Sequence, residues 1–464
     1  MTSNLSPPAH FLLFPFMSKG HTIPLLHLTH LLHRRNISVT IITTPLNSSF
    51  ISQSLTNTNT SIINIPFPQE IPEIPAGIES TDKLPSMSLF LPFAKATKLM
   101  QNDFEQILKS LNPITCVICD GFLHWAQESA YKHMIPVYFF YGMNIYSTVV
   151  GQILAQYRPQ ANCSSHDELF TLPVFPRIKL TKNDMEPPLD DFDENHPQMA
   201  FIMEQVVAAT KTKGYIVNSF YELESEFVEY WNRECYPKVW CIGPLCLVEI
   251  PKGQSTQKPR WLQWLDERLV PGGRPVLYVA FGSQAKISRE QYVEIANGLE
   301  RSEVNFLWVI RSKEIVELDW FEERVKDRGL VVRDWVDQGE ILSHEIVKGF
   351  MSHCGWNSVM ESICECVPIL AWPMLAEQHL NARIVVEELG VGIRVLAQNG
   401  SVRGFVGSEC IESKVRELME GDKVNELRNR VAEFGALAKK SMAEGGSSWC
   451  TLSHLIDEVG KVKV

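Results

Sequence analysis

The chain has 464 residues, of which 45% are hydrophobic and 21% charged, and its formal net charge is −11. This length indicates two or three domains with sizeable cores, and the negative charge argues against a nucleic-acid partner, which would need a basic face. The eleven cysteines are an odd number without the spacing of a small disulfide scaffold, so we expect reduced thiols and a cytoplasmic protein.

Short apolar runs alternate with helical patterns in the first half of the chain. The first run, "FLLFPF", is short and has no basic residues leading into it, so it indicates a strand and not a signal peptide. No stretch approaches the roughly 20 apolar residues that a membrane span requires. Strands are also expected at 38–44, 115–120, 137–141 and 213–220, and helices at 23–35 and 123–133, with Pro24 in the first turn of its helix. Such alternation predicts a parallel sheet with helices on both faces.

A run rich in Pro, Gly, Ser and Thr at 242–260 predicts a linker between one domain at 1–241 and a second at 261–440. The strands expected after it are 276–281, 305–310, 329–335, 346–351 and 367–372. The tail, 441–464, carries an apolar helical stripe, but the spacing does not identify its packing partner. Open parallel sheets bind ligands at the carboxyl ends of their strands, so two such domains predict facing sheets with a cleft between them.

A polar turn, "SHCGWNS", follows the apolar run that ends near residue 351. Gly355 would let the backbone approach a ligand, and a helix starting near Trp356 would offer N–H groups and its positive dipole end to an anion. Asn357, Ser358 and Glu361 share one helical face, so a phosphate at the helix start and a hydroxylated group one turn along would use all three. The alternative is a capped, buried helix with incidental polar residues.

The surrounding block carries a longer pattern. In order, residues 335–378 contain Trp335, Gln338, His353, Cys354, Gly355, Trp356, Asn357, Ser358, Glu361, Pro368, Trp372, Pro373, Glu377 and Gln378. This block resembles the signature box of plant secondary-product UDP-glycosyltransferases. Four other stretches are similar to motifs of the same family: "FPFMSKGHTIPLL", "VICDGFLHWA", "VLYVAFGSQAKIS" and "GYIVNSFYELE". The resemblance covers nearly the whole chain and implies an α/β protein of the GT-B fold, with two facing Rossmann-like domains, the donor bound by the C-terminal one and the acceptor by the N-terminal one.

The resemblance also implies the roles of the donor residues. Trp335 would stack on uracil, and Gln338 would contact the uridine. The diphosphate would be bound by Ser283, His353, Asn357 and Ser358, and the ribose hydroxyls by Glu361. The sugar would be contacted by Trp372, Glu377 and Gln378. Gly355 and Trp356 complete the set of donor residues. No prosthetic group is expected.

Three positions depart from the family pattern. The family usually has Gly at Cys366, Thr at Ser352 and Asp at Glu377. Gln378, the last position of the box, is the form associated with glucose donors, so UDP-glucose is the expected donor substrate. Glu377 is one methylene longer than the usual Asp, so the donor sugar could differ from glucose.

The resemblance assigns catalysis to His21, expected in a loop after the first strand and just before a helix, and to Asp120. His21 would act as the base, and Asp120 would bond its second ring nitrogen. Attack on the anomeric carbon from the face opposite UDP would give an inverted, β-linked product without a metal. The alternative for His21 is an ordinary surface histidine.

Two other patterns could suggest a metal or redox site. His27, His30 and His33 recur every three residues, but they would spread around a helix, and no carboxylate cluster lies nearby in the sequence. Cys116 and Cys119 fall in a predicted strand, where residues three apart point to opposite faces. We therefore predict no metal site.

The acceptor side is weakly specified. Aromatic and Met side chains in three segments fit a pocket for a flat, lipophilic acceptor, with ordinary core as the alternative. The candidates are Phe16, Met87, Phe90, Tyr141 and Asn144. A flavonoid or other phenolic is the expected acceptor, and a terpenoid, a hormone or C-glycosylation remains an alternative within the family.

Two function classes outside the family are alternatives. A nicotinamide-dependent oxidoreductase would need a GxGxxG fingerprint, and "FPFMSKGH" stands after the first strand instead. A non-catalytic nucleotide-sugar binder would have no use for His21 with Asp120. The expected partners are a UDP-sugar and a small-molecule acceptor, and the expected state is a monomer.

Overall fold

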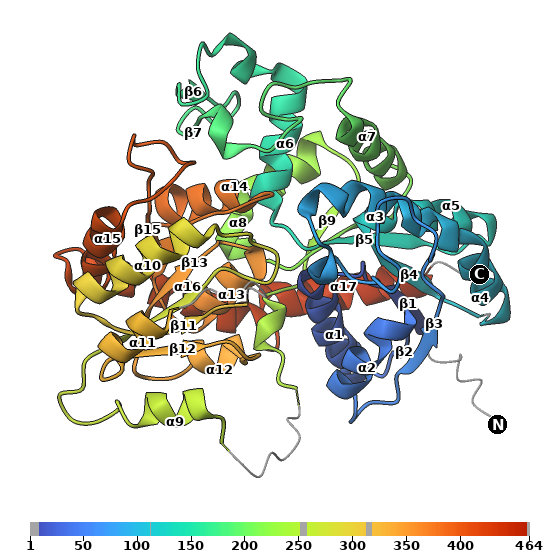
Figure 1. Ribbon diagram of the computed structural model, residues 1–464. Helices are drawn as coiled ribbons and strands as arrows, with labels where there is room; N and C mark the ends of the chain where they lie inside the picture. The colour runs from blue at the N-terminus through green and yellow to red at the C-terminus, as the bar shows by residue number, and fades with distance from the viewer. Residues whose placement is uncertain (1–8, 112, 251–257, 312–317, 462–464) are drawn as a thin grey trace. The chain divides into compact units, whose positions relative to one another are not determined.

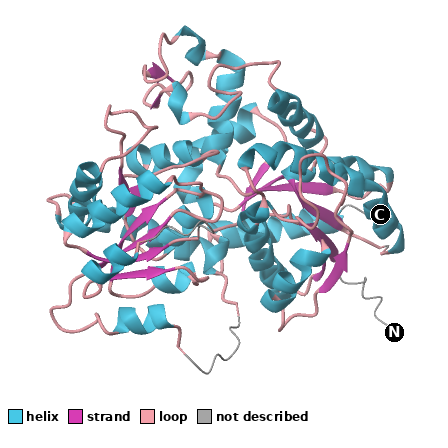
Figure 2. Ribbon diagram, in the orientation of Figure 1, coloured by secondary structure: helices cyan, strands magenta, loops and turns pink. Residues whose placement is uncertain are grey.

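The computed structural model describes residues 9–111, 113–250, 258–311 and 318–461. The chain divides into two compact units, which we call unit 1 (residues 1–145, 194–252 and 440–464) and unit 2 (residues 146–193 and 253–439). Within each unit, Figures 1 and 2 show strands flanked by helices. This division differs from the expected ranges, because residues 146–193 group with unit 2 and the tail groups with unit 1.

Unit 1 contains a seven-stranded parallel sheet in the order β3-β2-β1-β4-β5-β8-β9. Its strands are β1 (His10–Phe14), β2 (Ser38–Thr43), β3 (Ser61–Asn64), β4 (Cys116–Asp120), β5 (Val137–Tyr141), β8 (Gly214–Val217) and β9 (Val239–Cys241). The apolar runs predicted as strands are confirmed, while the short edge strands β3 and β9 were not predicted.

The helices of unit 1 cover both faces of this sheet, as expected for parallel strands that are apolar on both sides. They are α1 (Lys19–Arg34), α2 (Pro45–Ser54), α3 (Phe90–Ala96), α4 (Gln101–Ser110), α5 (Trp125–Lys132), α7 (Pro197–Ala209), α8 (Tyr221–Glu234) and α17 (Ser447–Lys461). On one face, Phe11 and Leu13 of β1 share a core with Leu28 of α1. On the other, Phe14 packs against Phe104 of α4 and Trp125 of α5 at 5.5 and 5.9 Å between ring centroids.

Helix α1 begins earlier than the sequence predicted. The carbonyl of Ser18 accepts the N–H groups of both His21 and Thr22, at 3.1 and 2.9 Å, which starts the helix at Lys19. Pro24 consequently lies inside the helix and not in its first turn. His21 lies in the first helical turn, so its expected position in a loop before the helix was wrong.

The C-terminal helix α17 finds its packing partner in unit 1. Leu452, Leu455 and Val459 are buried in the same core as β1, and the Ser448 hydroxyl donates to the carbonyl of Gly243. The apolar stripe read from the sequence is therefore the buried face of this helix.

Unit 2 contains a six-stranded parallel sheet in the order β12-β11-β10-β13-β14-β15. Its strands are β10 (Val276–Ala280), β11 (Asn305–Val309), β12 (Gly329–Val332), β13 (Val347–Ser352), β14 (Ile369–Ala371) and β15 (Gly392–Arg394), of which β15 was not predicted. A short antiparallel pair, β6 (Phe170–Thr171) and β7 (Lys179–Leu180), lies in the segment 146–193.

The helices wholly or mainly in unit 2 include helices on both faces of its sheet. They are α6 (Ile145–Tyr157), α9 (Arg260–Asp266), α10 (Arg289–Ser302), α11 (Asp319–Val325), α12 (Gln338–Leu342), α13 (Trp356–Cys364), α14 (Gln378–Arg383), α15 (Ser408–Glu420) and α16 (Val424–Met442), with a π-helical turn at Ile384–Glu388. Leu277 and Val279 of β10 pack with α10 and α15, while Val276 and Tyr278 pack with α9 and α12.

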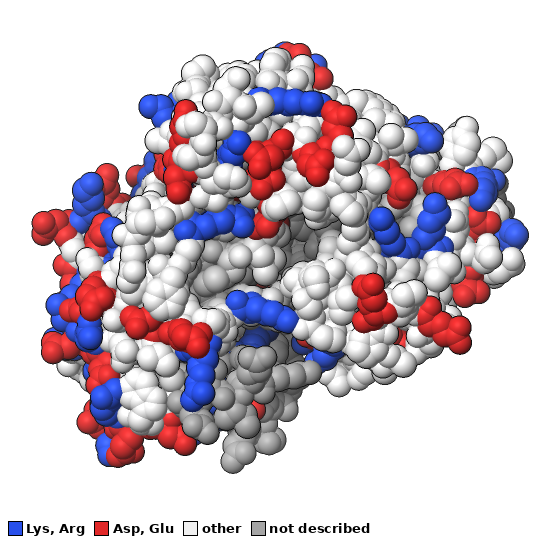
Figure 3. All heavy atoms as spheres, turned by 45° about the horizontal axis from the view of Figure 1, so that its top comes forward, with Lys and Arg blue, Asp and Glu red and all other residues white. Residues whose placement is uncertain are grey.

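The expected linker at 242–260 lies only partly within the described residues, because 251–257 are outside them. Its described part contains a 3-10 turn, Leu245–Leu247, and the first residue of α9. No helix in the described ranges is long and apolar enough to cross a membrane. All eleven cysteines are among the described residues, and none of them forms a disulfide. On the face drawn in Figure 3, acidic and basic side chains are interspersed.

Helix α13 ends with a cysteine where glycine is usual. The N–H of Cys366 donates to Ile363 O at 3.1 Å and the N–H of Val367 to Ser362 O at 2.9 Å, which is a Schellman motif. Cys366 takes the left-handed conformation of that motif, with φ of 58°. A Cβ at Gly435 would lie 2.5 Å from the Cys366 sulfur, so the glycine in α16 makes room for the thiol.

We expect Cys366→Gly to stabilise unit 2. Removing the Cβ from a left-handed position relieves about 1–2 kcal/mol, and the greater freedom of glycine in the unfolded chain offsets about 0.5–1 kcal/mol of this. The unfolding midpoint of the variant in differential scanning calorimetry should rise by about 1–3 °C. Cys366→Ala is the control, since it removes the thiol but keeps the Cβ, and an equal rise in that variant would show that the backbone is not the source.

Candidate active site

The candidate catalytic pair of unit 1 is hydrogen-bonded. Nδ1 of His21 lies 2.6 Å from Oδ2 of Asp120, and the side chains are 24% and 1% exposed. The other carboxylate oxygen, Oδ1, accepts the N–H of Phe122 at 2.9 Å. Because an ionised carboxylate only accepts, this geometry places the ring proton of a neutral His21 on Nδ1 and its lone pair on Nε2. The pair can therefore accept a proton at Nε2 while the buried carboxylate stabilises the resulting imidazolium.

Aromatic rings surround His21. Phe16, which is fully buried, lies 5.8 Å from the imidazole and 6.0 Å from Phe90, between ring centroids. Phe122 completes the cluster at 5.2 Å from both His21 and Phe16 and 5.4 Å from Phe90. The structure thus brings two of the five acceptor candidates, Phe16 and Phe90, together beside the candidate catalytic pair.

The other three acceptor candidates are not part of this ring cluster around His21. Tyr141 ends β5 next to Asp120, and a Cβ at Gly121 would lie 2.2 Å from its ring. Burial raises the pKa of the Tyr141 phenol well above its usual value. Asn144 is fully buried, and Met87 is half-buried in a short 3-10 turn before α3.

In unit 2, α12 and α13 bring three of the predicted donor residues together. The amide nitrogen of Gln338 donates to the Ser358 hydroxyl at 2.8 Å and to Oε2 of Glu361 at 2.6 Å. Withdrawal from water raises the pKa of Glu361 to about 7, with Asp337 adding to the rise and the Gln338 hydrogen bond opposing it. Helix α13 starts at Trp356, as predicted, and Glu361 lies one turn beyond Asn357.

His353 follows β13 and is packed between two glycines. A Cβ added at either Gly282 or Gly355 would lie 2.6 Å from its Nε2, so both backbones must run close to the ring. Gly282 also has φ of 75°, which side-chain-bearing residues rarely adopt. Burial, followed by the nearby charge of Arg311, lowers the pKa of His353 to about 4, so the imidazole is neutral at physiological pH.

The remaining donor candidates lie at different depths. Trp335 is 66% exposed, which leaves a ring face open for stacking, whereas Trp356 is 2% exposed and offers a ligand little side-chain surface. Asn357 is half-buried in the first turn of α13, and Ser283 is exposed in the turn after β10. Trp372 follows β14 and packs edge-on against Phe281 at 5.4 Å.

Glu377 and Gln378 mark the start of α14. The side-chain oxygen of Gln378 accepts the backbone N–H groups of Met374 and Leu375 at 3.0 and 3.1 Å, which fixes the turn before the helix. Oε1 of Glu377 accepts from the Asn381 amide at 3.4 Å. Hydrogen bonds to neighbouring residues of the chain therefore hold both side chains in place at the start of α14.

Sequence reasoning missed several residues of the site. Phe122 lies two positions after Asp120, and an aromatic beside a candidate catalytic residue was the available signal. Gly142 also lies beside His21, where a Cβ would be in ordinary contact with the ring at 3.6 Å, and no sequence pattern marks it. Gly282 was visible only as part of the "FGS" stretch.

The metal alternatives find no support in the contacts. His30 and His33 point to separate partners, the carbonyl of Ser54 and the hydroxyl of Thr60. Cys116 and Cys119 are fully buried in β4, which raises the pKa of both thiols. Among the described residues, no group of three or more His, Cys, Asp or Glu side chains could hold a metal ion.

Known proteins match this chain almost from end to end. The model of the UDP-glucoronosyl and UDP-glucosyl transferase family matches residues 203–425. The chain is 50% identical to UDP-glycosyltransferase 90A1 of Arabidopsis thaliana, over 97% of this chain and 96% of that protein. It is 34% identical to UDP-glucose flavonoid 3-O-glucosyltransferase 7 of Fragaria ananassa, with the same coverage of 97% and 96%.

A solved structure shows the same architecture. The crystal structure of Glycyrrhiza uralensis UGT73P12 complexed with glycyrrhetinic acid 3-O-monoglucuronide superposes with a TM-score of 0.88, at 29% identity, covering 98% of this chain and 96% of that one. The two parallel-sheet units of this chain account for that similarity. With half of its residues identical to a relative over almost its full length, the chain belongs to the plant family of UDP-glycosyltransferases with the GT-B fold.

Proposed function

We propose that this enzyme transfers glucose from UDP-glucose to a small lipophilic plant metabolite with inversion at the anomeric carbon. The observation that carries the proposal is the hydrogen bond between His21 and the buried carboxylate of Asp120. A hydrogen-bonded His–Asp pair beside an aromatic cluster suits deprotonation of an acceptor held by apolar contacts.

In the proposed reaction, Nε2 of His21 takes the proton of the acceptor hydroxyl. The acceptor oxygen forms a bond to the anomeric carbon as the bond from that carbon to the UDP oxygen breaks, and the electron pair of that bond leaves with UDP. Asp120 stays ionised and stabilises the imidazolium through Nδ1. Attack from the side opposite UDP turns an α-linked donor into a β-linked product.

The donor contacts are proposed on unit 2. Trp335 presents an open ring for uracil, and the carboxylate of Glu361 can accept hydrogen bonds from ribose hydroxyls. The neutral His353 and the first turn of α13 suit the diphosphate. Glu377 and Gln378 are assigned to the sugar hydroxyls, and the relative from Fragaria ananassa, whose name specifies UDP-glucose, supports glucose as that sugar.

A flavonoid or another phenol is the proposed acceptor class. The aromatic cluster of Phe16, Phe90 and Phe122 beside His21 favours a flat ring, and the same relative is named as a flavonoid 3-O-glucosyltransferase. A C-linked product or a terpenoid acceptor is the second candidate. A matrix of UDP-sugars and acceptors, read by mass spectrometry for added hexosyl units, tests both donor and acceptor.

We expect His21→Ala to lower kcat by about 10²–10⁴-fold, because general-base catalysis contributes rate enhancements of that size. Binding of UDP, measured by calorimetry, should be unchanged, since the proposed donor contacts lie on unit 2. His33→Ala is the control, because His33 lies in the same helix and its ring contacts the hydroxyl of Thr60 instead of Asp120. Turnover at the wild-type rate in His21→Ala would refute the assignment of the base.

Uridine binding should depend on the ionisation of Glu361. With a pKa of about 7, protonation turns the carboxylate into a carboxylic acid, which accepts hydrogen bonds from ribose hydroxyls less strongly, so the dissociation constant of uridine should rise by up to about tenfold from pH 8 to pH 6. Uridine is used because it has no phosphate that titrates in this range. The variant Glu361→Gln should bind weakly at both pH values, and a flat profile in the wild type would contradict the proposed role.

Gly282→Ala should weaken binding of the diphosphate through His353. The added Cβ would lie 2.6 Å from Nε2, so the imidazole must move. The dissociation constant of UDP should rise at least about tenfold while that of uridine changes little. Gly272→Ala is the matched control, because its φ of 80° imposes a similar backbone cost but nothing lies within 4 Å of the new Cβ. Equal losses in both variants would show that strain alone is responsible.

A further inference from the structure

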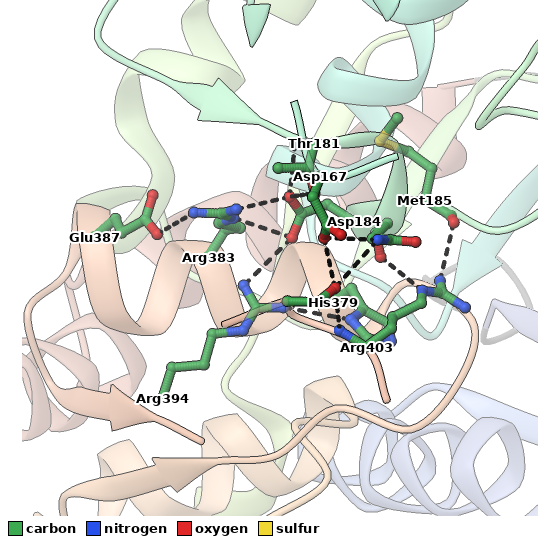
Figure 4. Close-up of polar contacts among 11 residues, drawn as sticks. Asp167, Thr181, Asp184, Met185, His379, Arg383, Glu387, Arg394 and Arg403 are labelled. Carbon is green, nitrogen blue, oxygen red and sulfur yellow. Dashed lines mark hydrogen bonds and ion pairs between the residues drawn. The ribbon is translucent and has the colours of Figure 1, made fainter. Parts of the chain in front are cut away.

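A buried ion cluster in unit 2 is centred on Asp184 (Figure 4). Its carboxylate is fully buried and accepts from Nε and Nη2 of Arg383 at 3.0 and 2.8 Å and from Nη1 of Arg394 at 3.3 Å. The N–H and hydroxyl of Thr181 add two further hydrogen bonds, at 2.8 and 3.0 Å. Burial alone would raise the pKa of Asp184, but the two guanidinium groups outweigh it and hold the pKa below its usual value.

The cluster joins parts of the chain that are far apart in sequence. Asp184 ends a 3-10 turn in the segment 146–193, whereas Arg383 ends α14 and Arg394 ends β15. Arg383 also pairs with Glu387, in the π-helical turn that follows α14. The carboxylate of Asp184 therefore binds both the last residue of α14 and the last residue of β15.

Helix α14 is the element that begins with the two proposed sugar contacts, Glu377 and Gln378. In its first turn, His379 lies 3.3 Å from Nη2 of Arg394, so the helix start is tied to the same cluster. Withdrawal from water, followed by the surrounding arginines, lowers the pKa of His379 to about 3, which leaves a neutral ring that can accept from the guanidinium. Asp184 thus reaches the first turn of α14 through Arg394 and its last residue through Arg383.

A second contact from the same segment acts on the middle of α14. The Ser147 hydroxyl in α6 donates to Oδ1 of Asn381 at 3.2 Å. The Asn381 amide in turn donates to the carbonyl of Cys354 at 2.9 Å and contacts Oε1 of Glu377 at 3.4 Å. Asn381 therefore connects the helix to the loop of His353 and to a proposed sugar contact.

Other ties between this segment and the second sheet lie away from the start of α14. Arg403 pairs with Glu186, and Arg177 with Glu388. These contacts attach the segment, but they do not touch the residues that begin α14. Asp184 and Ser147 are distinguished from them because each has a partner in α14 itself, Arg383 for Asp184 and Asn381 for Ser147.

We propose that Asp184 is a positioning residue for sugar recognition: through Arg383 and Arg394 it holds α14 so that Glu377 and Gln378 meet the hydroxyls of the donor sugar. The inference rests on the proposed function, since it assigns Asp184 a role at the sugar end of the same donor site. Uracil and diphosphate are assigned to other elements, so the effect is confined to the sugar.

The test compares UDP with UDP-glucose by calorimetry for the wild type, Asp184→Asn, Ser147→Ala and the control Asp191→Asn. Asp191 lies in the same segment and pairs at the exposed surface with Lys182, so it controls for the substitution itself. In Asp184→Asn, the dissociation constant of UDP-glucose should rise at least about fivefold and that of UDP less than about twofold. The kcat/KM ratio of UDP-glucose to UDP-galactose should fall as well, which a general loss of stability would not cause.

Ser147→Ala removes a single hydrogen bond and keeps the test decisive if Asp184→Asn does not fold. It should raise the dissociation constant of UDP-glucose by about twofold and that of UDP by less. Equal loss of both ligands in a folded Asp184→Asn protein, or no selective change in either variant, would overturn the positioning role. A wild-type chain that binds neither UDP nor UDP-glucose would instead overturn the proposed function, so the two failures are distinguishable.

Discussion

A parallel sheet covered by helices on both faces leaves the carboxyl ends of its strands as the place where polar groups can be presented, and the candidate sites of both units obey this constraint. In unit 1, Asp120 and Tyr141 are the last residues of β4 and β5. In unit 2, His353 directly follows β13, Gly282 lies two residues beyond β10, and Arg394 ends β15. The apolar strands build the cores, and the candidate site residues lie at or just beyond the last residues of these strands.

Three inward-lying carboxylates show how differently the fold treats a negative charge. Asp184 is held ionised by two arginines, and the buried Asp120 faces a histidine and a backbone N–H. Glu361 accepts a hydrogen bond from the amide of Gln338, but its withdrawal from water outweighs that bond and raises its pKa to about 7. Asp184 is suited to fixing elements in place, and Asp120 to supporting a proton transfer. Glu361 is suited to accepting hydrogen bonds from ligand hydroxyls in place of the one from Gln338.

Both histidines of the candidate sites are packed against glycine backbone. Gly142 passes His21, and Gly282 and Gly355 enclose His353. A side chain at Gly282 or Gly355 would collide with the ring, so these glycines are required by close approach and not by turn geometry alone. Cys366 is the reverse case, because a residue with a side chain takes the left-handed conformation that glycine usually adopts. The glycine here is its neighbour Gly435, which leaves room for the thiol.

The two parallel sheets, the start of α13 and the family could be predicted from the sequence, because buried strands appear as apolar runs and the donor block is a local pattern of fixed spacing. The folded chain was needed to show that His21 lies in a helix, that α17 packs within unit 1 and that residues 146–193 group with unit 2. Asp184 meets Arg383 across 199 positions of sequence. Contacts of that range depend on the path of the whole chain, and neither local propensity nor spacing carries that information.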